Sequence, residues 1–370
     1  MTAPVATTAA GAALDGAAAA GFVRLRVAAV DPLTDDSVVL TFEVPPEHAE
    51  RFCFTPGQHL TLRGVVDGQE LRRTYSVCSS AVGGPLRVAV KRLAGGLFST
   101  WATTALRAGD EIEVLPPAGR FGPALDPAQS RRYGLVAAGS GITPVLSIAA
   151  SVLDVEPGSD VVLLYGNRRQ RQVMFLEELS DLKDRHPARL QVLHVLSQEE
   201  QESELLSGRI DAERLQRLFA AGLLPVDDVD VWYLCGPFGM VTDGRQALLA
   251  AGVDTARIHV ELFHADAPPP PKREGPRGEA ATVTVVLHGR TSTLSLRPDD
   301  ESVLDAVLAS RPDAPYACKG GVCGTCRARV VEGHVEMAVN YALEPDELAA
   351  GVVLTCQSRP TTPTVRLEFL

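Results

Sequence analysis

Tyr316-Ala317-Cys318-Lys319-Gly320-Gly321-Val322-Cys323-Gly324-Thr325-Cys326 holds three cysteines with the spacing C-x4-C-x2-C, and a fourth, Cys356, follows thirty residues after the third. This spacing is typical of a plant-type 2Fe-2S cluster, which four cysteine thiolates bind. Thiolates from so short a loop converge only if the backbone wraps closely around the cluster. Glycines permit this because they carry no Cβ, and the loop has Gly320, Gly321 and Gly324. The sequence therefore predicts a 2Fe-2S cluster bound by Cys318, Cys323, Cys326 and Cys356.

Three alternative roles for these cysteines fit the segment less well. A structural zinc site usually has two C-x2-C pairs or combines cysteine with histidine, and only one C-x2-C pair is present here. Disulfides are typical of small secreted domains. A reduced cysteine group with a purely structural role does not need three glycines between its members.

The length and composition indicate a multidomain globular protein. A chain of 370 residues is too long for one hydrophobic core and predicts two or three domains. The formal net charge of -11 argues against non-specific binding to nucleic acid. The three remaining cysteines, Cys53, Cys78 and Cys235, lie far apart and give no sign of a disulfide framework, so we expect a reducing, cytoplasmic location.

The N-terminal segment and the longest apolar region do not suggest a membrane protein. Residues 1–20 are rich in alanine and threonine, lack the basic start of a signal peptide, and are predicted to be a disordered tail. The longest apolar region, 135–153, contains Gly139, Gly141 and Pro144, which favours a strand, a turn and a helix over a membrane span.

Residues 21–125 are predicted to form a small antiparallel β-barrel. Six short alternating segments bounded by turn residues support this, with one helix near 98–106. The expected strands are 22–30, 37–44, 58–63, 70–77, 86–91 and 111–115.

Two motifs in this barrel suit a phosphate-bearing aromatic cofactor. In Arg73-Thr74-Tyr75-Ser76, an arginine able to neutralise phosphate shares a strand face with an aromatic ring, although such a strand is also common as a cross-strand pair. In Gly95-Gly96-Leu97-Phe98-Ser99, glycines open a helix whose free N–H groups can hold a pyrophosphate, although an ordinary turn has the same pattern.

Residues 126–264 change to alternating strands and helices, which predicts a doubly wound α/β nucleotide domain. Continuous apolar runs, typical of parallel strands covered on both faces, occupy 133–138, 161–165, 190–196 and 229–234. Segments with helical period occupy 143–153, 174–185, 211–218 and 238–251.

The first strand of this domain leads into Gly139-Ser140-Gly141-Ile142-Thr143-Pro144. We expect Thr143 to cap the following helix and Pro144 to be its first residue, with a pyrophosphate at the turn. The second strand ends at Asn167-Arg168-Arg169, where the adenosine ribose lies in dinucleotide sites. Arginines and no acid occur there, which favours the 2'-phosphate of NADPH, the alternative being a solvated basic loop.

These motifs together resemble the ferredoxin-NADP reductase superfamily, in which R-x-Y-S and G-x-x-S segments bind FAD. The resemblance implies that Arg73 and Ser99 face the phosphates, and that Tyr75 and Ser76 lie beside the isoalloxazine and act in catalysis. Thr74, Gly95, Gly96 and Leu97 belong to the same implied FAD site.

The nucleotide turns of this superfamily also have counterparts. G-x-G-x-T-P is its usual pyridine-nucleotide turn, and its C-G-P segment lies against the nicotinamide. By resemblance, Cys235 is catalytic with Gly236 and Pro237 beside it, although a buried thiol at a strand end is the plain structural alternative. The tail Glu261-Leu262-Phe263 is implied to approach the flavin.

The last part of the chain is divided into a linker and a cluster domain. Residues 265–279 contain four consecutive prolines, Pro268 to Pro271, and are predicted to be a tether. Residues 280–370 resemble the β-grasp ferredoxin fold, with strands expected at 282–287, 291–297, 327–331, 352–355 and 365–369 and a helix at 302–309.

The order of flavin, nucleotide and ferredoxin domains resembles reductases that supply oxygenases with electrons. The cluster loop and Asn340-Tyr341-Ala342-Leu343-Glu344-Pro345-Asp346-Glu347-Leu348-Ala349-Ala350-Gly351 resemble the reductase subunits of phenylacetyl-CoA epoxidase complexes. The resemblance implies a di-iron oxygenase as the electron acceptor and NADPH as the donor. The alternatives are a reductase for another aromatic-ring or steroid oxygenase, and a flavin and iron–sulfur redox sensor without turnover.

Overall fold

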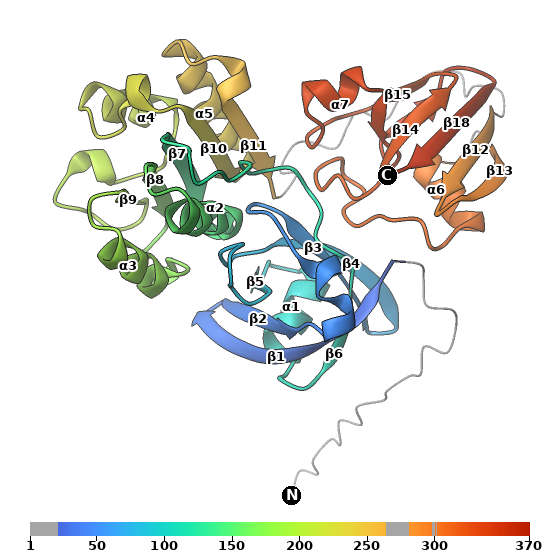
Figure 1. Cartoon of the computed structure of the whole chain (residues 1–370), viewed down its shortest axis with the longest axis horizontal. Coiled ribbons are helices and arrows are strands. Elements are labelled where there is room, and N and C mark those ends of the chain that lie inside the picture. The colour runs from blue at the N-terminus through green and yellow to red at the C-terminus, as the bar shows by residue number, and fades with distance from the viewer. Residues whose placement is uncertain (1–20, 264–280, 298–299, 301) are drawn as a thin grey trace, which may run out of the picture.

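A computed structural model describes residues 21–263, 281–297, 300 and 302–370, which form three β-sheet domains (Figure 1). The predicted disordered tail and the predicted proline-rich tether lie outside the described residues. No helix in the described part of the chain is long and apolar enough to cross a membrane. The fold class expected from the sequence is confirmed for all three domains.

The first domain is an antiparallel sheet with the strand order β4-β3-β6-β1-β2-β5. A bridge between Val77 and Val88 brings the two edge strands together, so the sheet curls into a barrel. Its interior is filled by alternate side chains such as Leu25 and Leu62, and by Phe98 of the helix α1. The elements are β1 Val23–Thr34, β2 Ser37–Glu43, β3 His59–Val66, β4 Gln69–Ser76, β5 Arg87–Lys91, α1 Leu97–Thr104 and β6 Glu111–Val114.

The second domain is a parallel sheet with the strand order β11-β10-β7-β8-β9. Side chains alternate between two cores, so Leu135 packs under α2 while the next residue, Val136, packs under α4 and α5. The strands are β7 Arg132–Ala138, β8 Asp160–Asn167, β9 Leu190–Leu196, β10 Val231–Gly236 and β11 Ile258–Leu262. The helices are α2 Ile142–Val155, α3 Leu176–Arg185, α4 Ala212–Ala220 and α5 Phe238–Ala250.

The strand order places a topological switch point between β7 and β10. Helices that follow these two strands leave in opposite directions, which opens a crevice at the carboxyl ends of the strands. The Gly139–Gly141 turn and the Cys235–Pro237 turn stand at those two ends. The fold therefore brings together the two nucleotide motifs that the sequence separates by almost a hundred residues.

The third domain is a mixed sheet with the strand order β13-β12-β18-β14-β16, and a two-stranded sheet of β15 and β17 lies beside it. β12 and β18 run parallel, and the other pairs run antiparallel, which is the β-grasp arrangement. The strands are β12 Ala281–Leu287, β13 Arg290–Leu296, β14 Arg327–Glu332, β15 Val335–Met337, β16 Val352–Leu354, β17 Ser358–Pro360 and β18 Thr364–Phe369. The helices are α6 Val303–Ser310 and α7 Pro345–Ala349.

Short 3-10 turns connect several of these elements. They are η1 Pro46–His48, η2 Glu50–Phe52, η3 Gly139–Gly141, η4 Gln170–Gln172, η5 Glu204–Leu206, η6 Val226–Asp228 and η7 Thr255–Arg257. Four regular elements of the described residues were not expected from the sequence, namely β11, α7, β15 and β17.

Candidate functional site

The four cysteines predicted to bind the cluster lie in the third domain, and their exposure differs. Cys318 is exposed at the tip of the loop, whereas Cys326 and Cys356 are buried under it. The backbone N–H groups of Gly320 and Cys323 donate to Cys318 Sγ at 3.3 and 3.4 Å. N–H groups that point at a sulfur stabilise the thiolate, which is the form that binds iron.

These cysteines form two pairs, Cys318 with Cys323 and Cys326 with Cys356. The thiol of Cys323 lowers the pKa of Cys318, and the thiol of Cys356 raises the pKa of Cys326, because each pair is in hydrogen-bonding contact. Among the described residues, no group of three or more His, Cys, Asp or Glu gathers closely enough to hold a metal ion. Two pairs of cysteines supply the four thiolates that a cluster of two irons takes.

The glycines of the loop also fit the wrapped backbone that a cluster requires. Gly321 and Gly324 adopt φ of 75° and 66°, a region that favours glycine. A Cβ at Gly324 would lie 2.8 Å from the guanidinium carbon of Arg327, which packs against this turn of the loop. The residues present therefore fit a 2Fe-2S cluster.

The expected flavin residues lie on β4 and at the start of α1 of the barrel. Arg73 is exposed, Thr74 and Tyr75 are half-buried, and Ser76 is buried. The Tyr75 ring stacks on Phe98 of α1 with centroids 5.9 Å apart. The strand motif and the helix motif are thus joined by a ring contact, and the Tyr75 ring is held in place on the face of the barrel.

The glycine turn before α1 is exposed at Gly95, but the hydroxyl of Ser99 just after it already has hydrogen-bond partners within the turn. Gly95 has φ of 72°, and Gly96 precedes Leu97, the first residue of α1. Ser99 was expected to face a phosphate. Its hydroxyl instead accepts from the Leu93 N–H at 3.1 Å and donates to the Gly96 carbonyl at 3.2 Å. Gly96 N–H also has a partner, since it donates to the Leu93 carbonyl at 3.0 Å. The N–H groups of the first turn of α1 have no partner within the helix and are the candidate phosphate-binding groups.

The nucleotide turn begins its helix earlier than expected. The prediction that Thr143 caps the helix and Pro144 starts it is wrong, because α2 begins at Ile142, directly after η3. Thr143 donates instead to the Ser140 carbonyl at 3.0 Å. Pro144 still fits, since the N–H groups of a first helical turn have no helical partner to lose.

The two nucleotide turns touch. A Cβ at Gly141 would lie 2.1 Å from the Cys235 carbonyl oxygen, so only glycine allows this approach. Cys235 is fully buried, Gly236 ends β10, and Pro237 precedes α5. This contact closes one side of the crevice at the switch point.

A half-buried carboxyl joins the nucleotide domain to the barrel beside this contact. Glu261 Oε2 accepts from Ser76 Oγ at 3.4 Å and from Cys235 Sγ at 3.9 Å. Burial raises the pKa of Glu261 to about 8 and raises the pKa of the Cys235 thiol. Three groups named separately in the sequence therefore meet at one point, where a neutral carboxylic acid can donate or accept a proton near neutral pH.

The arginine loop after β8 is exposed and receives an acid that was not expected. Arg168 and Arg169 are exposed, and Asn167 is buried at the strand end. Glu199, from the loop after β9, accepts from the Gln170 N–H at 2.9 Å. The sequence interpretation that no acid occurs there was therefore incomplete, because Glu199 arrives from the neighbouring strand.

A small cavity of about 30 Å³ lies between Glu261 and the loop that holds Cys323. Its lining includes His59 and Glu261 on one side and Cys323, Arg327 and Tyr341 on the other. Burial, with a further effect of Arg327, lowers the pKa of His59 to about 4, so this imidazole is neutral. Sequence reasoning missed His59 and Arg327, and the only signal was the position of His59 directly after the Pro56-Gly57-Gln58 turn.

The arrangement of one barrel, one doubly wound domain and one β-grasp domain defines a flavin and iron–sulfur oxidoreductase. Residues 24–122 match the family described as oxidoreductase FAD-binding domain. Residues 135–246 match the oxidoreductase NAD-binding domain, and residues 285–361 match the 2Fe-2S iron-sulfur cluster binding domain. The expected cofactor classes are confirmed at this level.

Whole-chain similarity narrows the class to reductase components. The chain is 47% identical to one of the subunits of the 1,2-phenylacetyl-CoA epoxidase of Escherichia coli K12, over 94% of this chain and 98% of that protein. It is 38% identical to the ferredoxin reductase component of 3-ketosteroid-9-alpha-monooxygenase of Rhodococcus rhodochrous, over 94% and 97%. Phthalate dioxygenase reductase shares the fold, with a TM-score of 0.57, 22% identity, and coverage of 94% of this chain and 98% of that chain.

The chain therefore belongs to the ferredoxin-NADP reductase superfamily, in the group of oxygenase reductase components that carry a C-terminal 2Fe-2S domain.

Proposed function

We propose that this protein carries electrons from NADPH, through FAD and a 2Fe-2S cluster, to a di-iron oxygenase that epoxidises phenylacetyl-CoA in aerobic phenylacetate degradation. The similarity to the Escherichia coli epoxidase protein supports this acceptor. When bound, FAD accepts a hydride and gives up electrons singly, and the cluster carries them one at a time. A cytoplasmic location is part of the proposal, and the seven free cysteines support it because thiols stay reduced there.

The cavity shared by Glu261 and Cys323 is the observation that carries this proposal. It makes the proposed hydride site and a proposed cluster ligand neighbours, although they belong to different domains. Ser76, Glu261 and Cys235 orient the reacting rings, and Glu261 holds a proton. Ser76 and Cys235 are buried, which keeps water from their side of the site. Tyr75 provides the ring surface on which a flavin stacks.

The remaining site residues have binding roles in this proposal. Arg73 neutralises the charge of the FAD phosphates, and N–H groups at the start of α1, in the Gly95-Gly96-Leu97 turn, donate to them, with Thr74 beside them; the Gly96 N–H itself is taken by the Leu93 carbonyl. The Gly139–Gly141 turn, Thr143 and Pro144 hold the pyrophosphate of the nucleotide. The proposed domain limits are 21–125, 126–264 and 280–370, and the extents of the three sheets support them.

The preference for NADPH depends on the loop after β8. Arg168 and Arg169 place two exposed positive charges at the strand end where a 2'-phosphate lies in this fold. Glu199 lies in the same loop region but accepts from a backbone N–H, so part of its charge is already satisfied. The excess of positive charge supports NADPH as the preferred donor.

Reconstitution with candidate oxygenases tests the proposed acceptor. The holoprotein is mixed with the oxygenase subunits of a phenylacetyl-CoA epoxidase, NADPH and phenylacetyl-CoA, and the epoxide is measured against NADPH consumed. We expect tight coupling between the two. Similar coupled turnover with a 3-ketosteroid hydroxylase component, and none with the epoxidase, would favour the steroid alternative, which the similarity over the whole chain keeps open.

Turnover with an artificial acceptor separates a reductase from a redox sensor. A reductase oxidises many equivalents of NADPH in the presence of ferricyanide. A sensor without turnover stops once its own flavin and cluster are filled.

A further inference from the structure

The side chain of Arg72, on β4 of the FAD barrel, reaches the cluster domain. Its side chain is one of the few buried charges of the barrel, with 5% of the residue exposed. Arg72 Nη1 donates to the Ala314 carbonyl at 3.3 Å, and Nη2 donates to the Pro312 carbonyl at 3.4 Å. Both carbonyls belong to the segment 312–316, which leads directly into the cluster ligand Cys318.

The rest of the guanidinium is also enclosed by partners from both domains. Its central carbon lies 4.2 Å from the ring centroid of Tyr316 in the cluster domain and 5.3 Å from that of Phe22 in the barrel. Its Nε donates to Glu70 at 2.9 Å, so a carboxylate balances the charge. A planar guanidinium can stack on a ring and donate along its edge at the same time, which an ammonium group cannot do.

A second polar contact across the same boundary is more exposed to solvent. Arg120 of the barrel side pairs with Asp346 of the cluster domain at 3.1 Å, but both side chains are more than half exposed. Exposed pairs contribute little, because water and salt screen them. The Arg72 contact is therefore the better-shielded polar link of the two.

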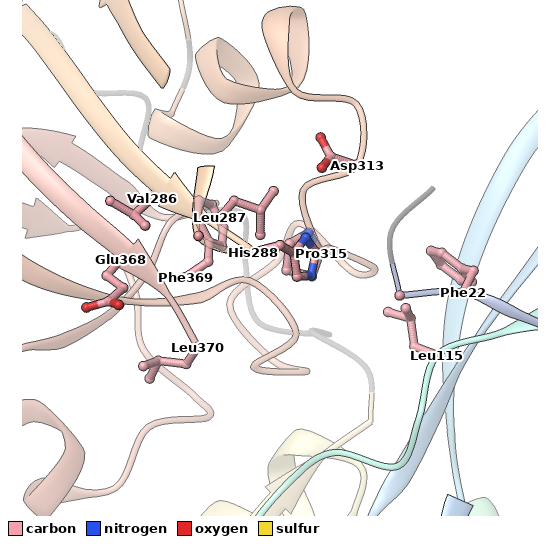
Figure 2. A pocket seen from close by; sticks show the side chains of 12 residues that line it. Phe22, Leu115, Val286, Leu287, His288, Asp313, Pro315, Glu368, Phe369 and Leu370 are labelled. Atoms are coloured by element: carbon pink, nitrogen blue, oxygen red, sulfur yellow. The ribbon is translucent and has the colours of Figure 1, made fainter. Parts of the chain in front are cut away.

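Apolar packing is also interrupted next to Arg72. A cavity of about 380 Å³ separates Phe22 and Leu115 of the barrel from His288, Pro315 and Leu370 of the cluster domain. Figure 2 shows Phe22 and Leu115 on one side of this cavity and His288, Pro315 and Leu370 on the other. Because no continuous apolar core fills this part of the boundary, a directed polar contact has a larger share in holding the domains together.

We propose that Arg72 is a positioning residue that docks the cluster domain on the FAD barrel, and thereby sets the rate at which electrons pass from flavin to cluster. Each transfer removes one electron from reduced FAD and adds one to the oxidised cluster, with no other atoms exchanged. The inference rests on the proposed internal electron path but not on the identity of the oxygenase.

Anaerobic rapid mixing of the holoprotein with saturating NADPH, or with NADH if that is oxidised faster, tests this role. Arg72→Met keeps the length of the side chain and removes the donors, and Arg72→Lys keeps the charge without the planar fork. Arg24→Ala, at an exposed arginine of β1, is the matched control. We expect flavin bleaching by the nucleotide to be unchanged in all variants.

Reduction of the cluster is the step that should change. Cluster reduction should slow by about tenfold in Arg72→Met. Only molecules whose cluster domain is docked on the barrel transfer electrons, so reducing the docked fraction to about a tenth lowers the observed rate in proportion. Arg72→Lys should fall between this variant and the wild type, and Arg24→Ala should match the wild type. Ferricyanide reduction taken directly from the flavin should not change.

Hydrogen exchange gives a second measurement that does not depend on turnover. Peptides covering 69–76 and 312–317 should exchange faster in Arg72→Met, while peptides of the nucleotide domain should not. Unchanged cluster reduction with unchanged exchange would overturn the proposal. An equal slowing of flavin bleaching and cluster reduction in Arg72→Lys would also overturn it, because that pattern indicates general damage. Failure of epoxidation with normal results here would contradict only the proposed oxygenase.

Discussion

Glu261→Gln should remove a pH dependence from the stability of the nucleotide domain. Burial raises the pKa of Glu261 from 4.5 to about 8, so the folded chain keeps a proton that the unfolded chain loses above its lower pKa. The stabilisation that the protonated Glu261 contributes is therefore fully present below the pKa of this carboxyl in the unfolded chain. It is lost as the pH rises toward the pKa of the carboxyl in the folded chain. The slope is about 1.4 kcal/mol per pH unit, which gives a loss of about 2 kcal/mol between about pH 6 and about pH 7.5.

Urea unfolding of the flavin-free protein measures this pH-dependent loss of stability. Without the flavin, only protein groups surround the Glu261 carboxyl. Trp232 is fully buried in the nucleotide domain, and in a Trp101→Phe background its fluorescence reports on that domain alone. The free energy of unfolding of the Glu261→Gln variant should stay level across this window relative to the wild type. Glu177→Gln, at an exposed glutamate of α3, serves as the control. An identical pH slope in Glu261→Gln and the wild type would mean that Glu261 is already ionised in the folded protein, and the burial argument would fail.

Three further predictions concern the cofactor sites. Cys323→Ser should abolish the cluster absorbance and iron content but leave flavin reduction by NADPH intact; simultaneous loss of both would contradict separate modules. Neutralising Arg168 and Arg169 to alanine should raise KM for NADPH by about tenfold or more, as expected for the loss of two charged phosphate contacts, and leave KM for NADH nearly unchanged; equal changes would remove these side chains from 2'-phosphate recognition. Gly141→Ala should weaken nucleotide binding and lower the thermal stability, because the new Cβ would lie 2.1 Å from the Cys235 carbonyl oxygen, a backbone atom that cannot swing away as a flexible side chain can; an unchanged dissociation constant, measured by titration calorimetry, would show that the turn can move.

Features that depend on a few neighbouring residues could be predicted from the sequence. The spacing from Cys318 to Cys326 and the glycines between them form one local pattern, and the continuous apolar run of β7 is typical of a buried parallel strand. β11 was missed because Ile258–Leu262 is short, lies at the edge of its sheet and is only partly buried, so its apolar signal is weak. The helix α7 was missed because it covers five residues within a polar stretch.

Contacts between distant segments could not be predicted in the same way. Glu199 is absent from the sequence neighbourhood of Arg168 and reaches that loop only because β8 and β9 are adjacent in the sheet. Arg72 and Arg73 are neighbours in sequence but point to opposite faces of β4, one buried toward the cluster domain and one exposed. The Arg73-Thr74-Tyr75-Ser76 motif identified Arg73 from the sequence. The different role of Arg72 becomes visible only in the structure, where the cluster domain packs against it.

The strand pairing of the third domain has a consequence for how such domains can be rearranged. β12, the first described strand of this domain, and β18, the last, lie side by side in the middle of its sheet. Fusion joints placed just outside these two strands leave the ladder intact, so the domain can be transplanted whole to either side of a foreign protein with only a new spacer. Shortening it by even the length of β18 would instead split the sheet at its centre, leaving β12 and β14 without the partner between them.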